Sequence, residues 1–216
     1  MDPKARYDKE RTDGKLNRLS VILAAAERVF TSKGIEKTTM QDIATEANIG
    51  IATLFRYFPK KEKLIVAVAT RLYEPILERF QTIAAEPMTS LAQLAALFDY
   101  FIEDHHNPSI TFMVDFESYA AHSPEPIDGI QQFNSLNRLI SQEYETIVRR
   151  GMEDGSIRTD IAVKETLTTV INAFGLFSKK LSLQNNILLL ESDYPSDVQL
   201  RVLKHILLDY LKPANG

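Results

Sequence analysis

Cysteine is absent from the 216-residue sequence, which excludes disulfide bridges, thiolate metal sites and cysteine nucleophiles. No apolar run approaches the roughly 20 residues needed to cross a bilayer, and the amino terminus has no apolar signal core. The sequence also lacks internal repeats, low-complexity segments and a glycine-rich phosphate loop. We therefore expect a soluble, cytoplasmic protein that uses no cofactor and does not bind membranes.

Charge is distributed unevenly along the chain. The net charge is −4, but residues 1–63 carry 13 Lys and Arg against 9 Asp and Glu, whereas residues 64–216 carry 12 against 20. A basic amino-terminal part attracts phosphates to that end of the molecule, while the acidic remainder repels them. The asymmetry is modest, so it supports a nucleic-acid partner without establishing one.

Residues 38–63 have the pattern of two short helices joined by a tight turn. Thr39 and Asp42 have the spacing of a capping box, so the first helix is expected to begin just after Thr39. Residues 48–50, Asn-Ile-Gly, tolerate turn geometry and precede a second helix at residues 51–57. This arrangement predicts a helix-turn-helix, in which the second helix is short enough to lie in a DNA major groove.

The second helix of this pair has distinct inner and outer faces. Ile49, Leu54 and Phe58 are expected to anchor it to the core. The outward residues are small, hydroxyl-bearing, aromatic or basic, and three lysines follow them. Small residues allow a close approach to bases, whereas hydroxyl and basic groups suit phosphates and base edges. From spacing alone, a packed helical corner followed by a solvated lysine run is an equal alternative.

Two stretches within this segment carry a family resemblance. Thr-Thr-Met-Gln-Asp-Ile-Ala at residues 38–44 and Ala-Thr-Leu-Phe-Arg-Tyr-Phe-Pro-Lys-Lys-Glu-Lys-Leu at residues 52–64 resemble the signature of the TetR family of one-component bacterial transcription regulators. The resemblance covers roughly residues 18–66. It implies a first helix that buttresses the pair, a recognition helix at residues 51–57, and a larger helical domain that dimerises and binds an effector.

The resemblance also implies which residues contact DNA. The residues placed at phosphates are Thr38, Thr39, Tyr57 and Lys61. The residues placed in the groove are Gly50, Ile51, Ala52, Thr53, Phe55 and Arg56. Four of these depart from the commonest family pattern: Gly50 and Ile51 stand where polar residues are frequent, Phe55 replaces tyrosine, and Arg56 replaces histidine. These departures bear on the operator sequence rather than on the mode of binding.

The chain is expected to be all-α and to have three parts. These parts are a mobile tail at residues 1–14, a helix-turn-helix DNA-binding domain at residues 15–63, and a helical effector-binding and dimerisation domain at residues 64–216. Outside the helix-turn-helix, apolar periodicity and Gly and Pro positions predict helices at residues 15–32, 60–85, 88–106, 109–121, 127–153, 160–184 and 196–211. Gly34 is expected to cap the first of these in the left-handed conformation, and Pro75 to kink the second, as a hinge or as a simple break.

Aromatic residues gather in the first half of the larger domain. Phe112, Phe116 and Tyr119 form one stripe at helical spacing. Such a stripe is more often ordinary core, but the resemblance also allows it to line an apolar pocket with a few polar contacts. The residues predicted for this pocket are Tyr100, Phe101, His105, Phe112, Phe116, Tyr119, Phe133 and Asn172. An aromatic lining favours a flat or apolar effector over a sugar or an ion.

A possible metal site lies next to these residues in the sequence. Glu103 and His106 form a Glu-x-x-His pair, and His105 is adjacent. Di-iron bundles need this pair twice together with glutamates from other helices, and here it occurs once. Histidines at a helix end more simply complement its dipole, so no metal site is expected.

Two carboxyl-terminal helices carry more apolar surface than a single stripe requires. A helix that is apolar over more than one stripe needs a second partner. By resemblance, two such helices from each subunit form a four-helix dimer interface, and burial within one subunit is the alternative. The residues predicted for the interface are Phe174, Phe177, Leu181, Val202, Ile206 and Tyr210.

The sequence as a whole therefore predicts a DNA-binding regulator rather than an enzyme. The expected protein is a homodimeric repressor that binds a palindromic operator in double-stranded DNA and is released by a small apolar or aromatic effector. The alternative is a helical-bundle metalloprotein or enzyme built around Glu103, His105 and His106.

Overall fold

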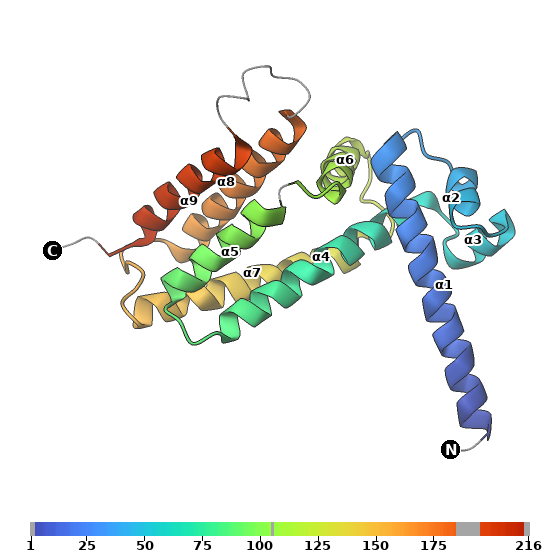
Figure 1. The fold of residues 1–216 in the computed structure, drawn as a ribbon, viewed down its shortest axis with the longest axis horizontal. Coiled ribbons are helices and arrows are strands. Elements are labelled where there is room, and N and C mark those ends of the chain that lie inside the picture. The colour runs from blue at the N-terminus through green and yellow to red at the C-terminus, as the bar shows by residue number, and fades with distance from the viewer. Residues whose placement is uncertain (1–2, 105, 185–194, 214–216) are drawn as a thin grey trace. The chain divides into compact units, whose positions relative to one another are not determined.

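The computed structural model describes residues 3–104, 106–184 and 195–213. Within them the chain is all-α, without strands (Figure 1). The helices are α1 (Pro3–Lys33), α2 (Met40–Glu46), α3 (Ile51–Tyr57), α4 (Lys61–Ala85), α5 (Ser90–Asp104), α6 (Ser109–His122), α7 (Ile130–Glu153), α8 (Val163–Gln184) and α9 (Ser196–Leu211). The all-α prediction is confirmed, and α3 and α9 have their predicted bounds.

The start of α1 differs from the prediction. Residues 3–14 belong to this helix instead of forming an irregular tail. The expectation of a tail was based on missing apolar periodicity, but Pro3 stands at the first helical position, where its missing N–H is harmless. Further along, the Thr12 hydroxyl donates to the Asp8 carbonyl, an ordinary contact on an exposed helix.

The chain divides into two compact units. Unit 1 comprises Met1–Leu72 and Phe112–Phe133, and unit 2 comprises Tyr73–Thr111 and Asn134–Gly216. This division differs from the predicted boundary after residue 63, because α4 runs from one unit into the other and most of α6 belongs to unit 1. The change of unit within α4 falls between Leu72 and Tyr73, close to Pro75.

The core of unit 1 is formed by α1, α2, α3, the first turns of α4, and α6. Ile22, Phe30, Ile43, Leu54 and Leu64 are completely buried there. Leu54 is one of the anchors predicted for the helix-turn-helix, and burial of such side chains contributes about 1.5–3 kcal/mol apiece. The short helices α2 and α3 therefore take their stability from packing rather than from their own length.

α6 joins unit 1 through an aromatic and a polar contact. The rings of Phe30 and Phe112 lie 5.6 Å apart, and Phe116 continues the series with Phe133 at 5.0 Å. An Asp115 carboxylate oxygen accepts a hydrogen bond of 3.3 Å from the Ile35 N–H in the loop after α1. The aromatic stripe of α6 is therefore part of the core of unit 1.

Unit 2 consists of the remainder of α4 together with α5, α8, α9 and most of α7. Helix α9 packs beside α5 and α8 (Figure 1). Lys204 joins α9 to Asp99 of α5 at 2.6 Å. The Ala84 carbonyl, near the end of α4, accepts hydrogen bonds from both Gln93 and Arg150. Such hydrogen bonds satisfy groups that a helix end leaves without intrahelical partners.

Candidate nucleic-acid interface

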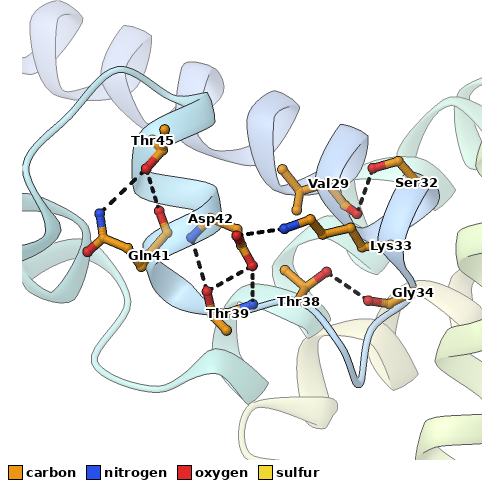
Figure 2. A network of polar contacts seen from close by, with 9 residues as sticks. All are labelled: Val29, Ser32, Lys33, Gly34, Thr38, Thr39, Gln41, Asp42 and Thr45. Atoms are coloured by element: carbon orange, nitrogen blue, oxygen red, sulfur yellow. Dashed lines mark hydrogen bonds and ion pairs between the residues drawn. The ribbon is translucent and has the colours of Figure 1, made fainter.

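The first helix of the pair, α2, begins with the predicted capping box. The Asp42 N–H donates to the Thr39 hydroxyl at 3.1 Å, and the Thr39 N–H donates to the Asp42 carboxylate at 2.9 Å. Lys33 at the end of α1 pairs with the same carboxylate at 2.6 Å (Figure 2). The hydrogen bond from Lys33, with those from Thr39, lowers the pKa of Asp42 from 3.8 to about 2. This network fixes the start of α2 to the end of α1.

The turn between α2 and α3 places its left-handed residue at Asn48 rather than at the glycine. Asn48 has φ 52°, and asparagine is among the residues that tolerate this conformation. Gly50 has φ −68° and serves as the N-cap of α3. A Cβ atom added at Gly50 would meet no atom within 4 Å. The backbone conformation therefore does not require glycine at position 50, and the amino-terminal end of α3 stays open on that side.

Helix α3 is held by its inner face. Leu54 and Phe58 are buried, and Ile49 in the turn is half-buried, as predicted. On the other side, Phe55 is 45% exposed and Arg56 is exposed as well. Helix α3 therefore presents an apolar and a cationic side chain next to each other on its outer face.

The other residues predicted to contact DNA, in α3 and just before α2, differ in their exposure to solvent. Ala52 is exposed, whereas Ile51, Thr53 and Tyr57 are half-buried. Thr39 is exposed, with its hydroxyl used in the capping box. Thr38 is only 2% exposed, and its hydroxyl donates to the Gly34 carbonyl at 2.7 Å (Figure 2). In this structure the Thr38 side chain stabilises the loop after α1 and is not available at the surface.

The lysines after α3 are tied to neighbouring parts of unit 1. Lys61 is half-buried, and its ammonium donates to the Glu36 carbonyl at 3.2 Å. Loss of water around this ammonium lowers the pKa of Lys61 from its usual 10.5. Lys60 and Lys63 both face Asp128, with N–O distances of 3.2 and 3.9 Å. Asp128 lies between α6 and α7, and no pattern in the sequence predicted that it would lie next to Lys60 and Lys63.

The residues predicted for the effector pocket are divided between the two units. Phe112, Phe116, Tyr119 and Phe133 belong to unit 1, whereas Tyr100, Phe101 and Asn172 belong to unit 2. Phe112 and Phe116 are core residues, and Asn172 is exposed on α8. His105 lies outside the described residues. The predicted set is therefore not one contiguous lining within either unit.

An open polar hollow lies in unit 2. It has a volume of about 420 Å³ and lies beside the end of α4, where its lining includes Ser90, Gln93, Arg150 and Asp154. Asp154 accepts hydrogen bonds from the Ser90 N–H and hydroxyl, both at 3.2 Å. These polar groups are engaged in joining helix ends, so the hollow is explained by the fold.

The residues predicted for the dimer interface fall into two classes. Phe174 and Leu181 are buried in unit 2, and Phe177 is half-buried against the same core. Val202, Ile206 and Tyr210 are each more than half exposed. Three further apolar residues of α8 and α9, which are not among the residues predicted for the interface, are exposed as well. They are Ile171, Leu176 and Val198.

The alternative metal site finds no support in the described part of the chain. Glu103 and His106 are both exposed near the junction of α5 and α6. Among the described residues, no group of three or more His, Cys, Asp and Glu side chains is arranged to hold a metal ion. The same residues contain no helix long and apolar enough to span a membrane.

Comparison with known proteins connects this geometry to a family. Residues 22–68, which contain α2 and α3, match the family model described as "Bacterial regulatory proteins, tetR family". The chain is 25% identical over 155 residues to the HTH-type transcriptional repressor KstR2 of Rhodococcus jostii (strain RHA1), covering 71% of this chain and 74% of the relative. It is 29% identical over 161 residues to the HTH-type transcriptional regulator CymR of Pseudomonas putida, covering 70% and 74%.

A solved structure shows the same fold over nearly the whole chain. The transcriptional regulator FadR from Bacillus subtilis, crystallised in complex with stearoyl-CoA, superposes with a TM-score of 0.71 at 15% identity. The match covers 89% of this chain and 99% of that one. At this identity the likeness establishes the fold and leaves the ligand of the present chain open.

Proposed function

From the premise that this chain belongs to the TetR family of bacterial transcriptional regulators, we propose that it is a homodimeric repressor of a palindromic operator. The observation that carries the proposal is the outer face of α3. Phe55 and Arg56 are exposed there while Leu54 and Phe58 anchor the opposite side. A rigidly held short helix with such a face meets the requirements for reading a major groove.

The side chains of α3 favour particular base edges. Arg56 is suited to donate two hydrogen bonds to the O6 and N7 atoms of a guanine. Phe55 and Ala52 are suited to apolar contact with thymine methyl groups. The open side of Gly50 allows the backbone to approach the DNA closely. We therefore expect each half-site to contain both guanine and thymine at positions facing α3.

Dimerisation is proposed to use the exposed apolar side of α9. Val198, Val202, Ile206 and Tyr210 recur every four residues, and all are at least half exposed. Residues at this spacing lie on one face of a helix. Leu176 on α8 is also exposed and adds to the apolar surface of this unit. A symmetric pairing of two such faces would present two copies of α3 to one DNA molecule.

Release is proposed to follow the binding of an apolar effector in unit 2. The unit holds a group of aromatic residues that includes the predicted Phe101 together with Phe80, Tyr144 and Phe174. An effector that binds one shape of the dimer more tightly than another shifts the population toward the first. A shape whose two α3 helices have the wrong separation then loses the operator.

Selection of bound sequences from a random double-stranded DNA pool tests the proposal directly. The full-length protein is expected to enrich one inverted repeat whose half-site centres lie about one helical turn, roughly 34 Å, or slightly more apart. A parallel selection with the double variant Phe55→Ala, Arg56→Ala controls for binding that does not depend on the outer face of α3. Enrichment of the same sequences by both proteins, or of none by the wild type, would contradict the proposal.

A further inference from the structure

The core of unit 2 contains an aromatic cluster contributed by four helices. Its members are Phe80 of α4, Phe98 and Phe101 of α5, Tyr144 of α7 and Phe174 of α8. The rings of Phe80 and Tyr144 lie 5.7 Å apart, those of Phe80 and Phe101 6.2 Å, and those of Phe101 and Phe174 6.4 Å. These separations are typical of favourable ring contacts. We call this group the unit 2 aromatic cluster.

One member of the unit 2 aromatic cluster carries a polar group that the fold does not use. Tyr144 is 2% exposed, and within the described residues its hydroxyl has no hydrogen-bond partner. Gln93 in the same unit is equally buried, but it donates to two carbonyls and accepts from Arg150. Buried polar groups are normally paired in this way, because leaving one unpaired is unfavourable.

A phenylalanine at position 144 would fill nearly the same volume without this cost. Four of the five members of the unit 2 aromatic cluster are phenylalanines, so the site readily accommodates that side chain. Packing of the free protein therefore does not explain why position 144 carries a hydroxyl group. Burial raises the pKa of Tyr144 well above its usual 10, so the hydroxyl stays protonated and remains a hydrogen-bond donor at all physiological pH values.

We propose that the Tyr144 hydroxyl orients a small apolar ligand by donating a hydrogen bond to an oxygen acceptor, such as a ketone, on that ligand. The ligand would lie among the rings of Phe80, Phe101 and Phe174, which offer apolar surface and no competing hydrogen bond. This inference deepens the proposed function and rests on it in one respect, namely that unit 2 is the part that binds the effector.

The ligand is expected to enter where the cluster borders half-buried residues. Ile76 and Ile140 pack against the buried core without being fully enclosed, as does Phe101. Side chains at such positions change rotamer more readily than those in the close-packed interior. Displacement of these residues brings the acceptor to Tyr144 without unfolding the helices.

The test uses the fluorescent ketone 6-propionyl-2-(dimethylamino)naphthalene, a flat apolar molecule with one acceptor whose emission shifts to the red when its carbonyl accepts a hydrogen bond. Full-length wild type, Tyr144→Phe and the matched control Tyr7→Phe, at an exposed position of α1, are titrated with the ketone. The same titrations with 2-(dimethylamino)naphthalene, which lacks the ketone, report apolar binding alone. Thermal unfolding of all three proteins is recorded without ligand.

The expected result is that Tyr144→Phe binds the ketone roughly tenfold more weakly than wild type, with bluer emission. It should bind the ketone-free analogue unchanged, and its unfolding temperature should equal or exceed that of wild type. Equal affinity and emission for both proteins, or failure of wild type to bind the ketone, overturns the inference. A lower unfolding temperature for Tyr144→Phe also overturns it, because the hydroxyl would then have a partner, such as an ordered water, in the free protein.

These outcomes are independent of the DNA selection. A protein that binds the ketone through Tyr144 but enriches no palindrome contradicts the proposed function and leaves the inference standing. A protein that enriches a palindrome but treats both naphthalenes alike contradicts only the inference.

Discussion

At the scale of single residues, the exposed side chains of α3 and the capping residues of α2 are expected to have different roles. Arg56 is exposed on α3. Asp42 instead caps the start of α2 through two hydrogen bonds with Thr39 and joins α2 to α1 through its ion pair with Lys33. A substitution of Arg56 should therefore alter DNA recognition, whereas a substitution of Asp42 should alter the stability of unit 1.

Arg56→Ala is expected to weaken operator binding by about 1–3 kcal/mol, because a bidentate contact to a base edge is lost. Binding to random DNA should change little, since the remaining lysines still attract phosphates. Fluorescence anisotropy at two salt concentrations measures both affinities. Arg138→Ala, which removes an exposed arginine from α7, is the matched control. Equal losses on the operator and on random DNA would remove Arg56 from base readout.

Asp42→Asn is expected to destabilise unit 1 at neutral pH and to have a smaller effect in acid. The folded-state pKa of Asp42, about 2, lies below its ordinary 3.8. A lowered carboxyl pKa means that the stabilisation is fully present above pH 3.8 and disappears as the pH falls through 2. Thermal unfolding of both proteins between pH 7 and pH 2 measures the difference. A difference that does not shrink as the pH falls would contradict this account of Asp42.

At the scale of helices and their ends, two glycines with different backbone conformations give a paired comparison. Gly34 has φ 81° after α1, and an added Cβ would lie 3.2 Å from an Asp115 carboxylate oxygen. Gly50 has an ordinary φ and open space. Gly34→Ala should therefore lower stability by about 1–2 kcal/mol. Gly50→Ala should stay within about 0.5 kcal/mol of wild type. Urea unfolding measures both, and equal effects would contradict the conformational argument.

The connection between α6 and α7 contributes Asp128 to the surface that is proposed to face DNA. Asp128 neutralises Lys60 and Lys63, so Asp128→Asn should strengthen binding to DNA of any sequence by up to about fivefold at low salt. Its salt dependence should become steeper, because two lysines are free to displace counterions. Asp209→Asn removes a comparable exposed pair with Lys212 in unit 2 and is the control. An unchanged salt slope for Asp128→Asn would show that Lys60 and Lys63 do not meet phosphates.

Helix positions were the part of the fold most accessible from sequence. Pro59 and Pro195 lie next to helix ends that local chemistry imposes, so the bounds of α3, α4 and α9 were predicted closely. Gly34 has the left-handed conformation expected of a C-cap. The start of α1 was missed because a solvated helix has no apolar stripe to reveal it. Asn48 taking the left-handed turn position in place of Gly50 depends on the local hydrogen bonds, which residue type alone does not determine.

At the scale of the whole molecule, the proposed pairing of subunits depends on exposed apolar residues of α9. Ile206→Glu should weaken self-association by at least about tenfold, because a charge at a buried apolar contact must be desolvated. Operator affinity should fall with it, since one copy of α3 reaches only one half-site. Sedimentation measures the association, with Val21→Glu at an exposed position of α1 as the matched control. An Ile206→Glu protein that stays dimeric would place the interface elsewhere.

Long-range packing was beyond the reach of the sequence. The spacing of Phe112, Phe116 and Tyr119 correctly indicated one helical stripe, but periodicity cannot say which core receives it. Phe112 packs on Phe30, more than 80 positions earlier, and so belongs to unit 1. Likewise, the apolar surface of α8 and α9 gave no basis for separating buried Phe174 and Leu181 from exposed Val202.

The contribution of α6 to unit 1 has a consequence for biosynthesis. Phe30 emerges early from the ribosome, but its partner ring, Phe112, is translated much later. The nascent chain therefore cannot complete the core that supports α3 until most of α6 has left the exit tunnel. A fragment truncated after residue 72 would contain the entire helix-turn-helix and still leave one side of that core uncovered.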